Sequence, residues 1–190
     1  MQPLIQKIQS IQPLTEAETL AFSELMEYKA FKTKDFFVTE GKYCNHIAII
    51  ISGFMRTFHL DESGNEITSD FGAPGSFTSS YYSFYSRKPA FEYIQAITDC
   101  EALLISYNNL QQLYSHSFNF NVLGRKIVEQ SCISKELYLK KMITLKASGR
   151  YKWFVEQYPE VNRIAQLQHI AAFLGIKAET LSRIRAKAIS

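Results

Sequence analysis

Cysteine and histidine are scarce in this sequence, and neither residue type is clustered. The three cysteines, Cys44, Cys100 and Cys132, lie far apart and form no Cys-x-x-Cys pair, which argues against structural zinc and iron–sulfur sites. The four histidines are equally isolated, and no two of them have the spacing of metal ligands. We therefore predict no metal site and no cofactor, and we expect three buried or idle thiols in a reducing compartment.

Long apolar runs are also absent. The longest candidate, from Ile47 to Ile51, has the length of a strand and falls far short of the roughly 18–20 residues that cross a membrane. The N-terminal residues contain no hydrophobic block, so they do not resemble a secretory signal. With 46% hydrophobic and 21% charged residues among 190, the chain can bury a core without disulfides. We expect a cytoplasmic protein with no membrane partner.

The charge is unevenly distributed, although the net charge is only +3. Residues 1–120 carry 8 Lys and Arg against 13 Asp and Glu, whereas residues 121–190 carry 13 against 5. A basic end on an acidic body favours contact with a polyanion such as nucleic acid. A solvated surface would give the same count, so charge alone leaves both interpretations open.

A region of short β segments follows a predicted N-terminal helix. Thr15 and Glu18 form a capping box, which predicts that a short helix begins there. From about Tyr28 to Ser106, segments rich in Phe, Tyr and Ile alternate with turns rich in Gly, Asp, Asn and Ser. The clearest segments are 35–39, 46–52, 54–60, 66–71, 91–97 and 101–106. This spacing indicates a small β-sandwich or barrel.

A long helix is predicted after the β region. The segment from Gly124 to Leu145 contains no proline and no internal glycine. A partly apolar stripe with a repeat near 3.5 residues runs along it, and we assign the dimer-facing positions to Leu123, Ile127, Gln130 and Leu137. Such a helix could pack on its own domain or on a second copy of the chain. We favour the second copy, because a helix of this length overhangs a small β domain.

A helix-turn-helix is predicted near the C-terminus. Ile170 and Leu174 lie four residues apart on a first helix, and Leu181 lies on a second. Between the two helices, Gly175 can adopt the positive φ that a sharp turn requires. The small side chain of Ala171 allows the helices to cross closely. The alternative is an ordinary corner between two helices with no role in binding.

The exposed face of the second helix carries side chains that suit the major groove. We assign DNA binding to Lys177, Glu179, Thr180, Ser182, Arg183 and Arg185. Arginine binds guanine O6 and N7 with two hydrogen bonds, glutamate accepts from cytosine N4, and serine and threonine reach phosphates or base edges. Further contacts with the phosphate backbone are expected from Lys177, Lys152 and Arg150.

Together these features resemble the cyclic-AMP receptor / fumarate–nitrate regulator (CRP/FNR) family of bacterial transcription factors. Its β-roll is matched by Glu40-Gly41, Ser52-Gly53, residues 61–66 (DESGNE) and the turn at 71–75, and its dimer helix by about 119–145. Within the second helix of the helix-turn-helix, Glu179-Thr180-Leu181-Ser182-Arg183 resembles the E-x-x-S-R arrangement of the FNR-like branch, in which Glu, Ser and Arg read base edges. Ala178 stands where the CRP-like branch has an arginine, so the resemblance implies an FNR-type half-site.

Two departures from the family pattern concern the effector. Members that bind cyclic AMP have a Gly-Glu pair on a short helix and, after a loop, an Arg that follows Pro and pairs with the cyclic phosphate. This chain has Gly75-Ser76 and Pro89-Ala90 instead, and the carboxylate of Glu92 would repel a phosphate. The iron–sulfur members carry an N-terminal cysteine cluster, whereas no cysteine precedes Cys44 here. We therefore expect neither tight cyclic-AMP binding nor that oxygen-sensing chemistry, and the effector stays unknown.

An effector pocket is assigned to the same region of the chain. Its candidate residues are Gly75, Ser76, Phe77, Tyr82, Ala90 and Glu92. The aromatic run Tyr81, Tyr82, Phe84 and Tyr85 in this region either packs in the core and as a lid or forms a ligand cage.

The resulting prediction is an α+β chain of three parts. Residues 1–117 form a cyclic-nucleotide-binding-like sensor β-roll (a double-stranded β-helix or jelly roll), residues 118–147 a dimerisation helix, and residues 148–190 a helix-turn-helix domain of winged-helix-like type. The sequence ends at Ser190, so we expect no wing strand after the second helix. The predicted function is that of a transcriptional regulator, not an enzyme. As a homodimer it binds a near-palindromic operator in double-stranded DNA, with RNA polymerase as a further partner.

Two other functions are weighed against this prediction. A metal-dependent enzyme of the cupin type also has a small β-roll, but it requires converging histidines with a His-x-His pair, and the sequence has none. A ligand-binding or protein-interaction module that has lost DNA binding would retain the same fold. Glu179, Ser182 and Arg183 argue against this second alternative and do not exclude it.

Overall fold

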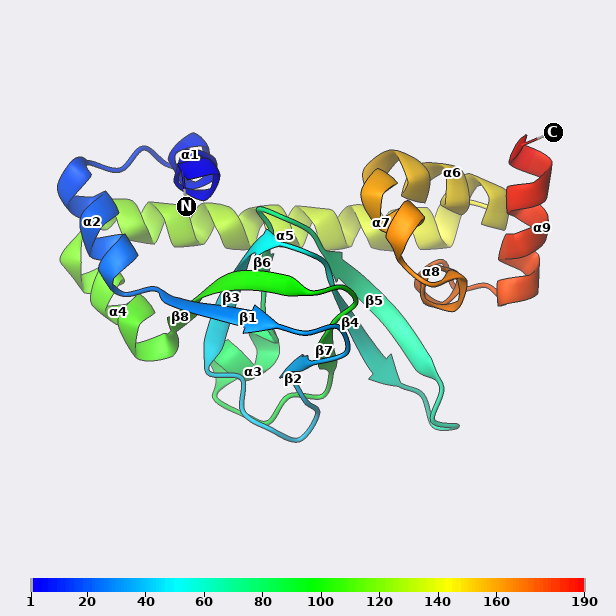
Figure 1. Ribbon diagram of the computed structural model, residues 1–190, viewed down its shortest axis with the longest axis horizontal. Coiled ribbons are helices and arrows are strands. Elements are labelled where there is room, and N and C mark those ends of the chain that lie inside the picture. Colours follow the sequence, from blue (N-terminus) through cyan, green and yellow to red (C-terminus); the bar gives the residue numbers. More distant parts are fainter. Residues whose placement is uncertain (1, 190) are drawn as a thin grey trace.

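Two four-stranded antiparallel sheets form the centre of the structure, a computed structural model that describes residues 2–189 (Figure 1). The first sheet has the order β1 (Glu27–Phe31), β8 (Cys100–Ser106), β3 (His46–Ser52) and β6 (Phe77–Thr78). The second has the order β2 (Phe36–Val38), β7 (Tyr93–Ala96), β4 (Met55–Leu60) and β5 (Glu66–Gly72). This arrangement confirms the predicted β-roll, and the predicted strand segments agree with β2, β3, β4, β5, β7 and β8 to within a few residues.

Strand β3 is buried on both faces, which explains the longest apolar run of the sequence. Ala48 and Ile50 point into the core between the two sheets, together with Met55 and Ile94 of the opposite sheet. Ile47 and Ile49 point to the other side, where helices cover the first sheet. Successive side chains of a strand alternate between its faces, so only a strand covered on both sides is apolar at every position.

Three helices cover the outer face of the first sheet at one end of the molecule. They are α1 (Gln2–Ile11), α2 (Glu16–Glu24) and α4 (Tyr107–His116). Helix α2 begins at the predicted capping box, in which the side chains of Thr15 and Glu18 each accept from the backbone N–H of the other. Glu18 also accepts hydrogen bonds from Ser117 and Asn119, and these bonds lower the pKa of its carboxyl to about 2. Helix α1 was not predicted from the sequence.

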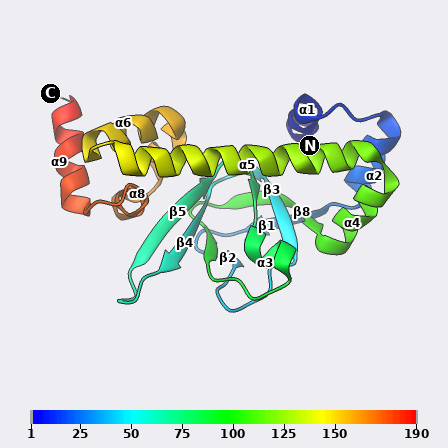
Figure 2. The same cartoon turned by 180° about the vertical axis from the view of Figure 1, so that it is seen from behind.

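The longest helix, α5 (Phe118–Thr144), runs along the whole molecule above the sheets (Figure 1). Leu123 and Ile127 pack into the core beneath the helix, against residues of the roll and of the N-terminal helices. This corrects their assignment to a dimer seam, because both face their own domain. Gln130 and Leu137 are exposed, as are Val128, Leu139 and Ile143. Figure 2 shows α5 from behind, where no strand of either sheet crosses in front of it.

Four helices follow at the far end of α5. They are α6 (Ala147–Gln157), α7 (Pro159–Ile164), α8 (Leu167–Phe173) and α9 (Ala178–Ile189). Their core is aromatic and includes Phe154, Tyr158 and Phe173. Phe71 of β5 inserts into the same cluster, 5.3 Å from Phe173 between ring centroids. The helical domain is therefore docked on the β-roll through a shared core. Within the described part of the chain, no helix has both the length and the apolar composition needed to span a membrane.

Candidate nucleic-acid interface and effector cavity

Helices α8 and α9 form the predicted helix-turn-helix. Gly175 has φ +64°, as the turn requires, and its N–H donates to the Ala172 carbonyl at 3.1 Å. The next N–H, of Ile176, donates to the Ala171 carbonyl at 3.0 Å, so both groups satisfy carbonyls at the end of α8. Ala171 is buried, as expected for the point where the helices cross. Helix α9 starts where the N–H groups of Thr180 and Leu181 donate to the Lys177 carbonyl.

The side chains of α9 divide into two faces. Leu181 is fully buried in the aromatic core, whereas Glu179, Ser182 and Arg183 are exposed. These three residues are spaced i, i+3 and i+4, so they project from one face of the helix. Lys177 is exposed just before the helix, and Thr180 lies at the edge of the same face, where its Oγ1 accepts a 3.4 Å hydrogen bond from Arg183. The structure therefore brings five of the six predicted DNA-binding side chains together on one surface.

Arg185, the sixth predicted residue, is directed into its own domain. Its Nη2 donates to Asn162 Oδ1 at 2.8 Å, and its guanidinium lies over the ring of Tyr151. The expectation is corrected on this point, because Arg185 follows Leu181 by four residues and shares its inner face. Arg150, expected to contact phosphates, is also engaged: its Nη1 donates to the Leu174 carbonyl at 2.9 Å. Both arginines stabilise the helix-turn-helix from within.

A cavity of about 380 Å³ lies between the β5–β6 turn and α5. Gly75, Ser76 and Phe77, three of the predicted effector residues, line it. No sequence signal pointed to its other polar lining residues, which include Lys7, Asp70, Lys135 and Tyr138. These come from separate elements, and no local pattern links them. Tyr138 reaches beyond the cavity, because its hydroxyl donates to the Phe173 carbonyl of α8 at 2.9 Å.

The other three predicted effector residues lie elsewhere, which corrects the assignment. Ala90 is buried in the core of the roll, and its backbone pairs with Gly41 and Lys42. The ring of Tyr82 packs against Phe91 on the surface, and Glu92 lies 3.8 Å from His59 Nε2. The short helix of the roll is α3 (Tyr81–Ser86), so the residues that precede it are Ser79-Ser80, whereas Gly75-Ser76 form a turn. Neither pair is acidic.

Comparisons with known proteins agree with this architecture. The family described as cyclic nucleotide-binding domain matches residues 28–117. No curated protein matches the chain in sequence. Among solved structures, FixK2 from Bradyrhizobium japonicum superposes with a TM-score of 0.74 at 16% identity, over 85% of this chain and 83% of that one. The c-di-GMP responsive global regulator CLP of Xanthomonas campestris gives 0.70 at 16% identity, over 92% and 91%. The catabolite activator protein of Thermus thermophilus gives 0.58 at 17%, over 95% and 85%.

Proposed function

We propose that this chain binds specific DNA through α9. Its residues 28–117 match the cyclic nucleotide-binding domain family, and it has the fold of the CRP/FNR transcriptional regulators. The observation that carries the proposal is the exposed face made by Glu179, Ser182 and Arg183 on a helix whose opposite face is buried. Such a helix fits the major groove, where these side chains have the donors and acceptors that distinguish base pairs. Lys177 supplies a contact to the phosphate backbone.

The proposed regulator is a homodimer that pairs through α5. Val128, Leu139 and Ile143 are exposed on the side of the helix opposite to Leu123 and Ile127, and Ile143 is 74% exposed. Large apolar side chains on the outer face of a long helix favour pairing with the same face of a second copy. Two copies related by a two-fold axis would present two α9 helices about one DNA turn apart, so the operator should be a near-palindrome.

Selection of bound duplexes from a random DNA pool tests this function directly. A palindromic motif whose half-site centres lie about one helical turn apart, roughly 34–36 Å, is the expected result. If binding is only non-specific and falls steeply with salt, the basic end acts as a polyanion contact, and the chain is better described as an interaction module.

Replacing Arg183 with alanine should weaken binding to the selected operator by about 1–3 kcal/mol and relax specificity at one base pair. The reason is that a bidentate contact from arginine to guanine has no substitute in alanine. The measurement is a titration of both proteins against the operator and against a variant with that base pair changed. Arg163→Ala is the matched control, because Arg163 is exposed in the same domain but lies on α7. An equal loss on all sequences would assign Arg183 to the phosphate backbone instead.

Cyclic AMP is not the proposed effector. The residue after Pro89 is Ala90, which is buried among apolar side chains and offers no cation to a cyclic phosphate. Calorimetric titration of the full chain with cyclic AMP should therefore show no binding in the micromolar range. Binding with micromolar or better affinity would contradict this, and Lys135→Gln would then test whether the cavity beneath α5 holds the nucleotide.

A further inference from the structure

A second cleft, of about 370 Å³, lies where the β-roll meets the helix-turn-helix domain. One wall comes from the roll and includes Arg56 of β4, Gln95 of β7 and Lys34 of the β1–β2 loop. The other wall comes from the chain around the start of α8 and includes Gln168 and His169. The cleft is separate from the cavity beneath α5, because the two share no lining residue. Any group bound in it would touch both domains.

Arg56 is the most unusual residue of this cleft. Its side chain is 3% exposed, and its Nη2 donates to Glu66 at 2.6 Å and to Gln95 at 2.9 Å. Its Nε and Nη1 are also buried, yet they have no hydrogen-bond partner among residues 2–189. A buried guanidinium N–H without an acceptor is costly, and native structures seldom retain one without a function. Two donors of Arg56 are therefore left without an acceptor in the wall of the cleft.

His169 adds an unpaired ring nitrogen from the other domain. It is buried, and its Nδ1 has no hydrogen-bond partner within the described chain. Burial and the nearby charge of Arg56 lower the pKa of His169 to about 4, so its ring is neutral at neutral pH. The charged groups that line the cleft are then Arg56, Lys34 and Glu66. The net charge of these three groups is one positive charge, which favours the binding of an anion.

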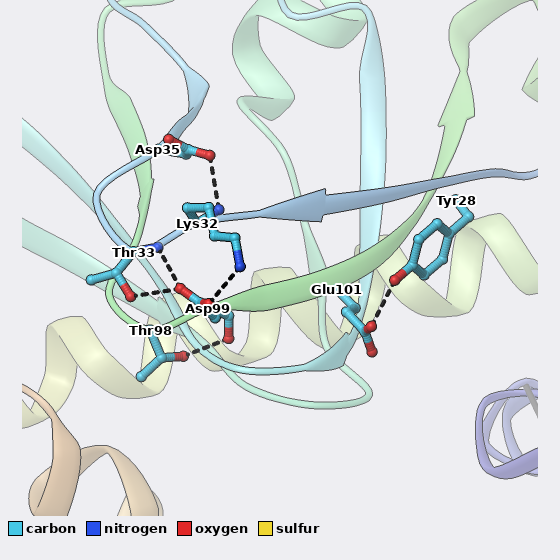
Figure 3. Close-up of polar contacts among 7 residues, drawn as sticks. All are labelled: Tyr28, Lys32, Thr33, Asp35, Thr98, Asp99 and Glu101. Atoms are coloured by element: carbon cyan, nitrogen blue, oxygen red, sulfur yellow. Dashed lines mark hydrogen bonds and ion pairs between the residues drawn. The ribbon is translucent and has the colours of Figure 1, made fainter.

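Lys34 is held at the mouth of the cleft by a strained backbone. Its φ is +77°, a conformation that residues other than glycine adopt only when the surroundings impose it. Figure 3 shows the polar network that fixes this loop, which centres on Asp99. The Asp99 carboxylate accepts from the Thr33 N–H at 2.9 Å and from Lys32 Nζ at 3.0 Å, and these contacts lower its pKa to about 2. A strained backbone conformation that neighbouring residues hold in place is typical of functional sites.

We propose that this cleft binds a small oxyanion, specifically a phosphate group, between Arg56 and Lys34 of the roll and His169 of the helix-turn-helix domain. Guanidinium, ammonium and imidazole N–H groups are the donors that phosphate oxygens accept from. The phosphate belongs either to a free small molecule or to the DNA backbone. In both cases the bound group links the roll to the domain that carries α9.

Inorganic phosphate is the probe for the first source, titrated into the full chain at constant ionic strength and without DNA. We expect wild-type protein to bind it and Lys34→Gly to bind it about tenfold more weakly, since one charge-assisted hydrogen bond is lost. Glycine accepts positive φ, so this variant should fold at least as well as wild type. Arg56→Lys keeps the charge next to Glu66 but removes the Nε and Nη1 donors, and it should also weaken binding.

A titration with DNA tests the second source. If the phosphate belongs to the backbone, Lys34→Gly should lower affinity equally on all sequences and reduce the salt dependence of binding by about one counterion. Lys42→Gln, which removes an exposed lysine outside the cleft, is the control for loss of charge in both titrations. The proposal is overturned if Lys34→Gly and Arg56→Lys match wild type in both. The phosphate titration contains no DNA, so its outcome is independent of the function proposed for α9.

Discussion

Replacing Phe71 with alanine should destabilise the docked arrangement of the two domains by about 3–5 kcal/mol, the usual range for a buried phenylalanine. Phe71 belongs to β5, but its ring contacts Phe154, Tyr158 and Phe173 of the helical domain at centroid distances of 5.9, 6.3 and 5.3 Å. Alanine would leave a cavity in the core that the two domains share. Because the lost contacts lie between the two domains, the domains should also unfold less cooperatively.

Differential scanning calorimetry can measure both effects of Phe71→Ala. We expect the main transition to move to lower temperature and a separate transition to emerge for residues 147–189. Phe91→Ala is the matched control, because Phe91 is 50% exposed and should change the transition little. A single transition at the wild-type temperature would show that β5 does not hold the helical domain in place.

The second large effect is expected at Gly53, in the turn between β3 and β4. Its φ is +79°, and a Cβ there would lie 2.7 Å from the Cα of Cys100 and still closer to the carbonyl oxygen of Asp99. Both obstacles are backbone atoms, one of Asp99 just before β8 and one of Cys100 at its start, so they cannot rotate away. Gly53→Ala should therefore lower the free energy of unfolding by about 4 kcal/mol or more, as severe overlaps with backbone do.

The variant Gly64→Ala distinguishes the two causes of this destabilisation, which are the positive φ and the overlap with backbone atoms. Gly64 has nearly the same φ, +81°, but a Cβ there would meet nothing within 4 Å. This variant should cost only the roughly 1–2 kcal/mol of a left-handed conformation. Urea denaturation of the two variants gives the comparison, and equal losses at the two glycines would contradict the role assigned to the Asp99 carbonyl.

Local patterns in the sequence were sufficient to predict most of the fold. The capping box at Thr15, the strand from His46 to Ser52 and the glycine turn at Gly175 are each specified by neighbouring residues, and the structure has all three. Helix α1 was missed because no capping signal marks its start. The error at Leu123 and Ile127 has another origin: an apolar stripe shows that a helix face is covered, but it does not show by what.

The candidate sites also differ in whether local sequence could predict them. The exposed face of α9 could be predicted because its residues lie within one helix of known period. Arg185 was assigned to that face from its charge, although its helical position places it beside Leu181. The cleft around Arg56 could not be predicted, because residues 34, 56 and 169 meet only when both sheets and α8 are in place. Nothing in the local sequence indicates that the guanidinium of Arg56 is buried.

The length of helix α5 determines how far a small rotation at the β-roll moves the helical domain. At 1.5 Å per residue, its 27 residues make a rod about 40 Å long. Its first half packs on the β-roll, and in its second half the hydroxyl of Tyr138 donates a hydrogen bond to α8. The half of α5 beyond the roll is about 20 Å long, so a tilt of about 10° where it leaves the roll would displace its far end by about 3.5 Å, close to the roughly 3.4 Å between neighbouring bases along a DNA strand. A rotation of this size, accommodated by the aromatic contacts of Phe71 with the helical domain, would thus shift α9 by about one base pair.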